Sequence, residues 1–183
     1  MIALAITMGV GRFAFTPILP LMQLDAGLSI PAGSWLAFAN YAGTLVGALT
    51  AVAMRVSLSA AIRGGLVAIG LVTVAMGLTG GFVAWLLLRA MAGLAVGWVL
   101  PLASAWALER LASHAPALRS AVFAGFGVGI AGAGVLCLGL MHVSARSSAA
   151  WLLLGVLSLA LTAIVWRCFD DAPPAMRQAA GPS

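Results

Sequence analysis

Two arginines, Arg12 and Arg89, interrupt long apolar runs of the sequence. Arg12 lies within GVGRFAFTPILP, about ten residues from either end of its run, which is roughly 15 Å along a helix. A guanidinium at that depth does not reach water easily, and burying one in a membrane costs about 2.5–3.5 kcal/mol. Arginines that carry this cost usually face a cavity or a partner, so both predict a binding site. Two structural alternatives stay open: either guanidinium could bind backbone carbonyls, and Arg89 could reach outward to the membrane surface.

The apolar runs supply no counter-charge for these arginines. The chain has four acidic residues, which fall at run ends or in the C-terminal tail: Asp25, Glu109, Asp170 and Asp171. A buried charge needs a partner, so the partner is expected to be an anionic substrate or a carboxylate on further helices. Asn40 and Tyr41, in the second run, are candidates to complete a substrate site with Arg12 and Arg89. Mid-helix Asn and Tyr also serve as hydrogen-bond partners between helices, and this alternative stays open.

The sequence lacks the residue patterns of catalysis, metal binding and nucleic-acid binding. No Ser–His or Ser–Lys pair lies inside an apolar run, and both histidines, His114 and His142, fall in predicted loops. Metal ligation by histidine needs several ligands at helical spacing, and Cys137 and Cys168 neighbour neither histidine nor each other. The nine arginines are scattered singly and form no patch. We therefore expect no enzyme activity, no metal, no cofactor and no nucleic-acid partner.

The composition places these residues in a membrane. Hydrophobic residues make up 63% of the 183 residues and charged ones 7%, whereas soluble domains carry about 25% charged residues. A transmembrane helix needs about 20 apolar residues, and six runs come near that length: 2–23, 33–54, 64–80, 82–108, 121–141 and 148–166. The sequence predicts an all-α integral membrane protein with six transmembrane helices, whose first partner is the lipid bilayer. We expect the polar tail, 167–183, to be disordered.

Arginines in the connections predict the orientation of the six helices. One side of the membrane collects six of them: Arg55, Arg63, Arg110, Arg119, Arg167 and Arg177. The other side has only Arg146, together with Asp25. Positively charged loops remain in the cytoplasm, so we expect both termini to be cytoplasmic.

Small residues are spaced for close helix packing. Gly43 and Gly47 in the second run are four residues apart, as are Gly93 and Gly97 in the fourth. This spacing lets helices approach closely in lipid. The fifth run, GFGVGIAGAG at 125–134, is denser in glycine than packing usually requires, and its glycines include Gly125, Gly129 and Gly132. We expect these glycines to form packing faces, and the fifth helix to act as a sliding or gating surface.

The first and fourth runs share an organisation. Each carries an arginine followed by proline or glycine, in GVGRFAFTPILP and in RAMAGLAVGWVLP, and we expect Pro17 and Pro20 to bend the first helix beside Arg12. Interrupted helices in two corresponding halves indicate a transporter site at the interface of two repeats. Three helices followed by three more make the repeats inverted in the membrane.

The same residues resemble those of a transporter family. RAMAGLAVG, with Arg89, Gly93 and Gly97, is similar to the R-x-x-x-G-x-x-x-G motif in the fourth helix of the major facilitator superfamily. GVGRFAFTPILPLMQ, together with GSWLAFANYAGTLVGAL, resembles more specifically the YbfB/YjiJ-type branch of its bacterial members. The resemblance covers residues 2–166, which implies that 1–166 form the N-terminal six-helix half of such a transporter.

The resemblance implies a function, with two departures. It implies secondary transport of a small molecule by alternating access in a bacterial inner membrane, with Arg12, Asn40, Tyr41 and Arg89 at the substrate. The loop ALTAVAMRVSLSAAIRGG lacks the aspartate of the family's gating motif, and family members have twelve helices where this chain has six. A second six-helix half, or a second copy of the chain, is therefore an expected partner. The alternative is a membrane protein that does not transport, either an inactive truncated fragment or an assembly partner.

Overall fold

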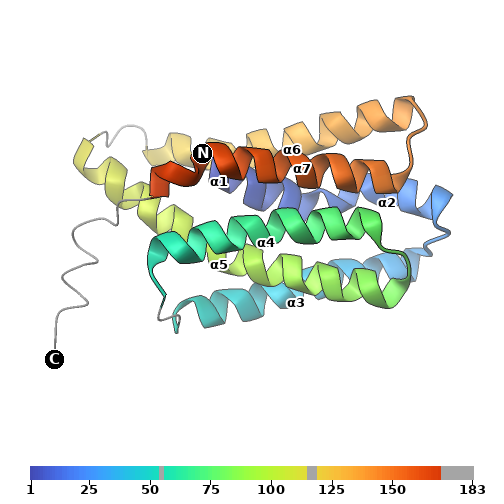
Figure 1. The fold of residues 1–183 in the computed structure, drawn as a ribbon, viewed down its shortest axis with the longest axis horizontal. Coiled ribbons are helices and arrows are strands. Elements are labelled where there is room, and N and C mark those ends of the chain that lie inside the picture. The colour runs from blue at the N-terminus through green and yellow to red at the C-terminus, as the bar shows by residue number, and fades with distance from the viewer. Residues whose placement is uncertain (54–55, 115–118, 170–183) are drawn as a thin grey trace.

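The computed structural model of the protein describes residues 1–53, 56–114 and 119–169. The first span consists of three consecutive pieces: α1 (Ile2–Ala5), the π-helical η1 (Ile6–Phe13) and α2 (Phe15–Asp25). The other helices are α3 (Ile30–Ala51), α4 (Leu58–Leu78), α5 (Phe82–His114), α6 (Arg119–His142) and α7 (Ser147–Val165), followed by the 3₁₀ turn η3 (Trp166–Phe169). The helices run along a common long axis, with Met1 and η3 toward the same end (Figure 1).

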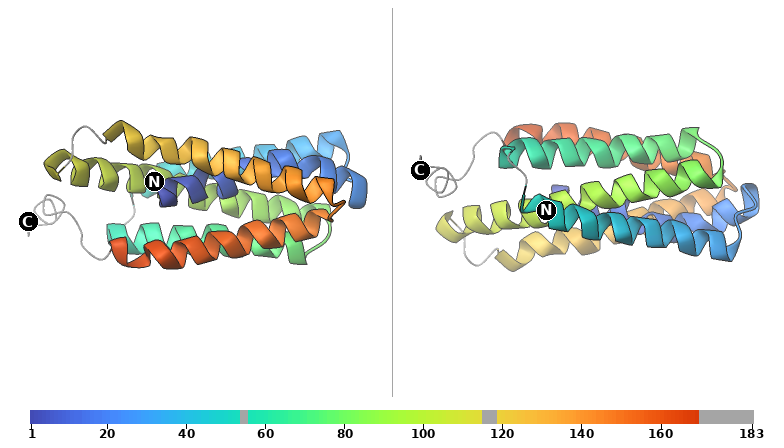
Figure 2. Two further views of the ribbon diagram at one scale, coloured as in Figure 1. Left: turned by 90° about the horizontal axis from the view of Figure 1, so that it is seen from above. Right: turned by 90° about the horizontal axis from the view of Figure 1, so that it is seen from below.

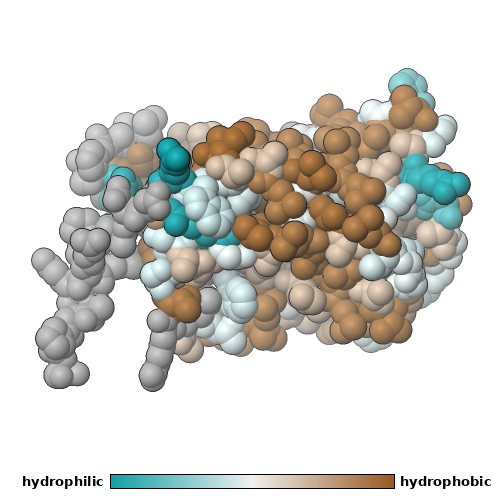
Figure 3. Space-filling view, viewed as in Figure 1, coloured by the Kyte–Doolittle hydropathy of each residue, from teal (hydrophilic) through white to brown (hydrophobic). Residues whose placement is uncertain are grey.

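The bundle has the dimensions and surface of a membrane protein. Five segments are long and apolar enough to cross a membrane: Ile2–Asp25, Leu58–Leu78, Phe82–Leu111, Ala121–His142 and Ser147–Phe169. α3 is not one of these five segments. It has 22 residues and packs among the other helices, and it carries the polar residues Asn40 and Tyr41. Apolar side chains cover the middle of the face in Figure 3, and polar ones gather toward its ends. The predicted all-α membrane fold is confirmed for the described residues.

Two helices begin three or more residues before the apolar runs that predicted them. α3 begins at Ile30 rather than at 33, and α4 begins at Leu58 rather than at 64. The reason is N-capping, because the Oγ atoms of Ser29 and Ser57 each accept a hydrogen bond of 3.3 Å from a backbone N–H three residues on. A cap fixes where a helix begins, whereas hydropathy indicates only the part that lies in lipid.

The last span continues into the region for which we predicted disorder. Residues 167–169 belong to η3, and Phe169 is buried with its ring centre 4.9 Å from that of Trp106. This contact explains the difference, since an aromatic ring packed on a neighbouring helix holds the turn in place. The rest of the predicted disordered tail, from residue 170 onward, lies outside the described residues.

The six spans form three layers (Figure 2). α4 and α7 lie on one side, the first span and α5 lie in the middle, and α3 and α6 lie on the other side. Each layer pairs one helix of the first three spans with its counterpart in the last three. This is the arrangement of two inverted three-helix repeats, so the predicted repeat organisation is confirmed.

Glycines of α3 bring that helix against α5. A Cβ atom on Gly43 would overlap the carbonyl oxygen of Ala90, and one on Gly47 would overlap that of Leu94. Only glycine allows two backbones to approach so closely. The glycine pair of the second run therefore forms the packing face that its spacing predicts.

The same contact recurs in the other repeat, between α6 and the first span. A Cβ atom on Gly125 would overlap the carbonyl oxygen of Met1, and one on Gly129 would overlap that of Ala5. Glycines four residues apart on the second helix of one repeat thus face backbone oxygens on the first helix of the other. The two repeats are held together by two equivalent glycine contacts.

These contacts fix the register of the two repeats, and they show that Arg12 and Arg89 occupy different positions in it. Met1 in the first span is equivalent to Ala90 in α5, because each offers its backbone oxygen to the first glycine of a pair. Arg12 follows both contact residues of the first span, Met1 and Ala5, whereas Arg89 precedes both contact residues of α5, Ala90 and Leu94. The shared organisation of the first and fourth runs therefore does not make Arg12 and Arg89 equivalent by symmetry.

At the end of the bundle opposite Met1, Asp25 joins the first span to α7. Its carboxylate accepts hydrogen bonds from the Oγ of Ser147, at 2.9 Å, and from the backbone N–H of the same residue. Ser147 is the first residue of α7, and a carboxylate at a helix N-terminus is stabilised by the helix dipole. Asp25 therefore has a structural partner and does not compensate a buried arginine.

Candidate functional site

Arg12 stands in the last turn of η1, beside an aromatic ring of α3. Its guanidinium carbon lies 4.9 Å from the ring centre of Tyr41 and 5.8 Å from that of Phe13. Arg12 is half-buried, and Tyr41 is 50% exposed. The buried Nε of Arg12 has no hydrogen-bond partner among the described residues. Arg12 and Tyr41 therefore present a cation and an aromatic ring together on one open part of the bundle.

Arg89, on α5, is buried instead. It is 3% exposed, its guanidinium carbon lies 5.0 Å from the ring centre of Phe15, and its Nη2 donates a hydrogen bond of 3.3 Å to the backbone oxygen of Arg12. Pro17 explains why that region needs a donor, because proline has no N–H for the carbonyls four and five residues before it, those of Phe13 and Arg12. The sequence left two structural alternatives open for Arg89. Its guanidinium binds a backbone carbonyl, which is the first of them, and does not reach outward to the membrane surface.

Asn40 connects three helices at the same level. Its Nδ2 donates hydrogen bonds to the backbone oxygens of Gly11, at 3.2 Å, and of Arg89, at 3.1 Å. Its side chain is 2% exposed, and the backbone oxygen of Asn40 accepts a bond from the hydroxyl of Thr44 at 2.8 Å. Asn40 thus acts as a hydrogen-bond partner between helices, the alternative that the sequence left open for it.

The winding of the first span changes next to Arg12. η1 ends at Phe13 and α2 begins at Phe15, with Pro17 in its first turn and Pro20 inside it. A π-helix places an extra residue in each turn and rotates every side chain that follows, and such segments are frequent at functional sites. The prolines lie beside the site as expected, but the π winding decides which way Arg12 faces, and no pattern in the sequence predicted it.

The four predicted site residues therefore come together in two pairs with different surroundings. Arg12 and Tyr41 form a partly open pair, whereas Asn40 and Arg89 are buried and hold the backbone beside Arg12. The sequence analysis missed the aromatic ring of Phe15 under Arg89. Its signal was the pair of phenylalanines that follows Arg12, Phe13 and Phe15.

The predicted packing glycines also differ in their surroundings: some contact a neighbouring helix, and others face no described residue. A Cβ atom on Gly93 would overlap the backbone oxygen of Asn40, and one on Gly97 would overlap that of Thr44, so both close the contact of α5 with α3. On α6, several glycines have no neighbour within 4 Å of an added Cβ: Gly127, Gly132, Gly134 and Gly139. Gly132 therefore packs against none of the described residues, and its packing role stays a prediction that requires another partner.

The described residues around Arg12 and Arg89 supply neither a counter-charge nor a cluster of metal ligands. No described carboxylate forms an ion pair with Arg12 or Arg89. No group of three or more His, Cys, Asp or Glu that could hold a metal ion occurs in the described ranges. Cys137 and Cys168 are free thiols, the first buried and the second exposed. An external counter-charge for Arg12 stays a prediction.

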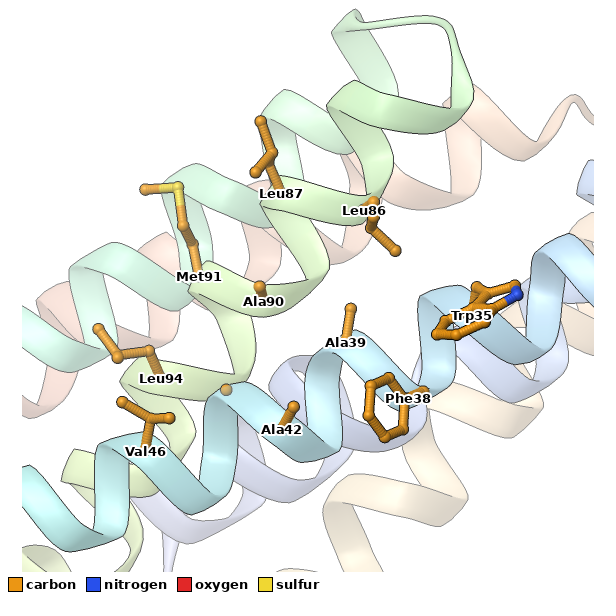
Figure 4. Close-up of a pocket in the computed structure, with 11 residues that line it drawn as sticks. Trp35, Phe38, Ala39, Ala42, Val46, Leu86, Leu87, Ala90, Met91 and Leu94 are labelled. Atoms are coloured by element: carbon orange, nitrogen blue, oxygen red, sulfur yellow. The ribbon is translucent and has the colours of Figure 1, made fainter.

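A groove between α3 and α5 is distinct from this site. It encloses about 530 Å³ and is lined almost entirely by apolar side chains, among them Trp35, Phe38, Leu87 and Met91 (Figure 4). Neither Arg12 nor Tyr41 lines it, and it offers no charged group. Ligand sites need a few polar groups to orient a polar molecule, so the candidate site lies at Arg12 and Tyr41 and not in this groove.

Comparison with known protein families gives a match over nearly the whole chain. A family model described as "Uncharacterised MFS-type transporter YbfB" matches residues 4–183. No curated protein and no solved structure matches the chain significantly. The matched segment includes Arg12, Asn40, Tyr41 and Arg89 together with the glycine contacts between the repeats.

Proposed function

The chain belongs to the YbfB family of MFS-type membrane transporters, and on this premise we propose that it carries a small anionic or polar molecule across the membrane by alternating access. The protein is thus a multi-pass membrane protein of a transporter family. Membership in that family gives no indication of enzyme activity, and the proposed chemistry is binding and release without a cofactor.

One observation carries the proposal for the substrate site: the guanidinium of Arg12 lies over the half-exposed ring of Tyr41 without a described carboxylate near it. An uncompensated cation in an apolar span favours an anion. The ring beside it adds an apolar surface and, through the cation–π contact, keeps the guanidinium in place. We assign Arg12 the role of binding the negative group of the substrate, and Tyr41 that of packing against the rest of the molecule.

Asn40 and Arg89 support the site from behind in this proposal. Both are at least nine-tenths buried, and their donors already bind the backbone of Gly11, Arg12 and α5. Such groups hold a neighbouring ligand in a fixed orientation, as supporting shells do at other binding sites. We propose that they position Arg12 rather than contact the substrate directly.

Alternating access requires a second six-helix body against which this one can move. We propose that it covers the layer of α3 and α6. Only 22% of the apolar stretch of α6 is buried, compared with 56% for the first span, and its outward glycines would allow a second body to approach closely. The second body would come from a partner chain, a second copy or further helices of a longer protein.

We further propose that the end carrying Met1 faces the cytoplasm of a bacterial cell, in the inner membrane. Arg63, Arg110 and Arg167 lie at helix ends on that side, whereas Arg146 lies at the start of α7 on the other. Arg55 and Arg177 lie outside the described residues, as does the side chain of Arg119. The exposed thiol of Cys168 offers a test, because a membrane-impermeant maleimide should label it in inside-out vesicles and not in intact cells.

The substrate site is tested by transport in proteoliposomes. The purified chain, reconstituted with a pH-sensitive dye inside the vesicles, is challenged with small monocarboxylates, dicarboxylates and inorganic phosphate, while current and internal pH are recorded. We expect at least one anion to give a signal that Arg12→Ala abolishes and Arg12→Lys retains in part. Arg146→Gln, at the far end of the bundle, is the matched control. Transport that is unchanged in both Arg12 variants would remove Arg12 from the substrate site.

A second candidate function is assembly without transport, and the sparsely buried α6 favours it as well. A cysteine placed at Gly132 should crosslink to the body that covers α6, whether that is another copy or another chain. A crosslinked partner together with no transport signal for any of the tested anions would favour an assembly role. A crosslinked partner combined with a signal abolished by Arg12→Ala would favour transport.

A further inference from the structure

The described part of the chain brings one accessible positive charge to the proposed substrate site. Arg12 is half-buried, and its Nε lacks a hydrogen-bond partner among the described residues. Arg89, the second arginine at this level, is 3% exposed, and its Nη2 already donates to the backbone oxygen of Arg12. The remaining arginines whose side chains the structure describes lie near helix ends: Arg63, Arg110, Arg146 and Arg167. A ligand at this level therefore meets the single charge of Arg12.

One cation in an apolar span favours a ligand with one negative charge. A charge buried in an apolar medium is costly unless an opposite charge neutralises it. A monoanion neutralises Arg12, whereas a dicarboxylate or a phosphate brings further negative charge, for which the described residues supply no second accessible cation at this level. A carboxylate also matches the planar guanidinium, because its two oxygens can accept two parallel N–H bonds. The charged part of the site therefore fits a single carboxylate.

The surface of α3 around Tyr41 is apolar. Phe38 and Leu45 lie three residues before and four residues after Tyr41, on the same face of the helix, and both are exposed. Polar side chains nearby on α3 are already engaged. The Nδ2 of Asn40 donates to two backbone oxygens, and the hydroxyl of Thr44 donates to a third. Apart from the Tyr41 hydroxyl, this part of α3 offers few hydrogen-bond partners to a hydroxylated molecule.

α6 is apolar as well, and it shares a layer with α3 beside the first span and α5 (Figure 2). Its residues 121–141 read AVFAGFGVGIAGAGVLCLGLM, and the thiol of Cys137, the one polar side chain among them, is buried. Exposed side chains of this stretch include Val128, Val135 and Leu138. A molecule held at Arg12 between α3 and α6 therefore meets apolar side chains on both helices, which favours a hydrocarbon body.

We propose that the molecule bound at Arg12 is a monocarboxylate with an apolar body, an inference that rests on the proposed substrate site. Its carboxylate accepts hydrogen bonds from the guanidinium of Arg12, and its hydrocarbon part packs on the ring of Tyr41 and beside Leu45. The single cation selects against dianions, and the apolar surfaces of α3 and α6 select against hydroxylated acids. The substrate of the proposed function is thereby narrowed to one chemical class.

Binding to the purified full chain tests this class with a matched set of six-carbon compounds. Hexanoate has one carboxylate and an apolar body, adipate has two carboxylates, gluconate has one carboxylate and a hydroxylated body, and hexanamide has no charge. Each compound is titrated by calorimetry into the chain in neutral-detergent micelles, with empty micelles as the blank. We expect hexanoate to bind about tenfold more tightly than any of the other three, because each of them leaves a charge or a polar group unpaired.

Three variants locate the binding on the structure. Arg12→Ala should abolish hexanoate binding, whereas Arg146→Gln, at the far end of the bundle, should leave it unchanged. Leu45→Ser makes the exposed surface of α3 more polar and should weaken hexanoate about fivefold, with no loss for gluconate. The melting temperature of each variant verifies that it is folded.

Two kinds of result separate a failure of this inference from a failure of the proposed site. If adipate or gluconate binds as tightly as hexanoate and Arg12→Ala abolishes that binding, the monocarboxylate class is wrong and Arg12 remains an anion site. If no compound binds, if hexanamide binds as tightly as hexanoate, or if Arg12→Ala leaves binding unchanged, the inference and the proposed substrate site both fail.

Discussion

Arg12 and Arg89 are identical in type and lie at the same level of the bundle, yet their surroundings differ completely. Arg89 is 3% exposed, stacks on the ring of Phe15 and donates to the backbone of the first span. Arg12 is half-buried, lies over the exposed ring of Tyr41 and has no described carboxylate nearby. A buried arginine is therefore not a ligand site by itself. The acceptors that the fold offers to its guanidinium decide its role.

The difference has a physical cause in the backbone of the first span. Pro17 cannot donate to the carbonyls before it, and the π winding of η1 disturbs the regular ladder. Unpaired backbone oxygens are unfavourable in lipid. Arg89 and Asn40 provide the missing donors. Arg12 has no such structural task, which leaves its charge available for a substrate.

The largest expected effect on stability comes from separating α3 and α5, the helices that carry the buried Asn40 and Arg89. Gly93→Leu would drive a side chain into the backbone oxygen of Asn40 and push α3 away from α5. We expect a loss of about 3 kcal/mol or more of unfolding free energy, visible as a lower melting temperature and a smaller monodisperse fraction. Gly132→Leu is the matched control, because its Cβ meets no neighbour. Equal damage by both changes would contradict the packing difference between the two glycines.

The next largest effect distinguishes the structural role of Arg89 from the binding role of Arg12. Arg89→Ala removes a charged hydrogen bond to the backbone, so we expect unfolding free energy to fall by about 2 kcal/mol. Arg12→Ala removes only the cation–π contacts with the rings of Tyr41 and Phe13 and should lower it by about 1 kcal/mol, while it abolishes anion transport. Unfolding in a graded detergent mixture measures both variants. If Arg12→Ala proved the more destabilising of the two, their roles would be reversed.

A smaller effect is expected for Asn40→Ala. Interhelical hydrogen bonds in membranes contribute about 0.6 kcal/mol each on average, and two are lost. The expected cost is therefore about 1 kcal/mol. The double variant with Arg89→Ala should cost less than the sum of the single ones, because both residues hold the same stretch of backbone. Strict additivity would indicate that the two residues act independently.

The smallest effect on stability is expected at Tyr41. Tyr41→Phe retains a ring for the guanidinium of Arg12 and should leave melting temperature and transport nearly unchanged. Tyr41→Ala removes a cation–π contact of about 0.5–1 kcal/mol at an exposed site, and should weaken the response to the transported anion more than it lowers stability. Identical transport by Tyr41→Ala and the unmodified chain would restrict the substrate contacts to Arg12.

Much of the fold could be read from local sequence. Hydropathy located the six spans, and glycine spacing located the faces of α3 and α5 that meet. Helix starts at Ile30 and Leu58 were missed, because the serine caps before them lie outside the apolar runs. The role of Gly132 could not be assigned either, because glycine spacing gives a face of a helix but not the helix that covers it.

The sequence indicated which four residues would come together but not how their contacts differ, and that they form a substrate site stays a prediction. All four predicted residues meet at one level, since mid-span polar groups in a membrane gather where they can find partners. Their bonds join residues far apart in the chain: Asn40 to Gly11, Asn40 to Arg89 and Arg89 to Arg12. No local pattern contains such pairings, and the π winding of η1 left no signature in composition or period.

By itself the sequence determined that this protein is a bundle of six membrane helices, with two arginines in its apolar spans and no acid beside them. These are local properties, fixed by residue type and spacing along each helix. The tertiary structure alone decided the register of the repeats, the direction of Arg12, and the burial of Arg89 against the first span. The physical reason is that donors and acceptors in lipid must satisfy one another across helices, and only the packed bundle determines which ones meet.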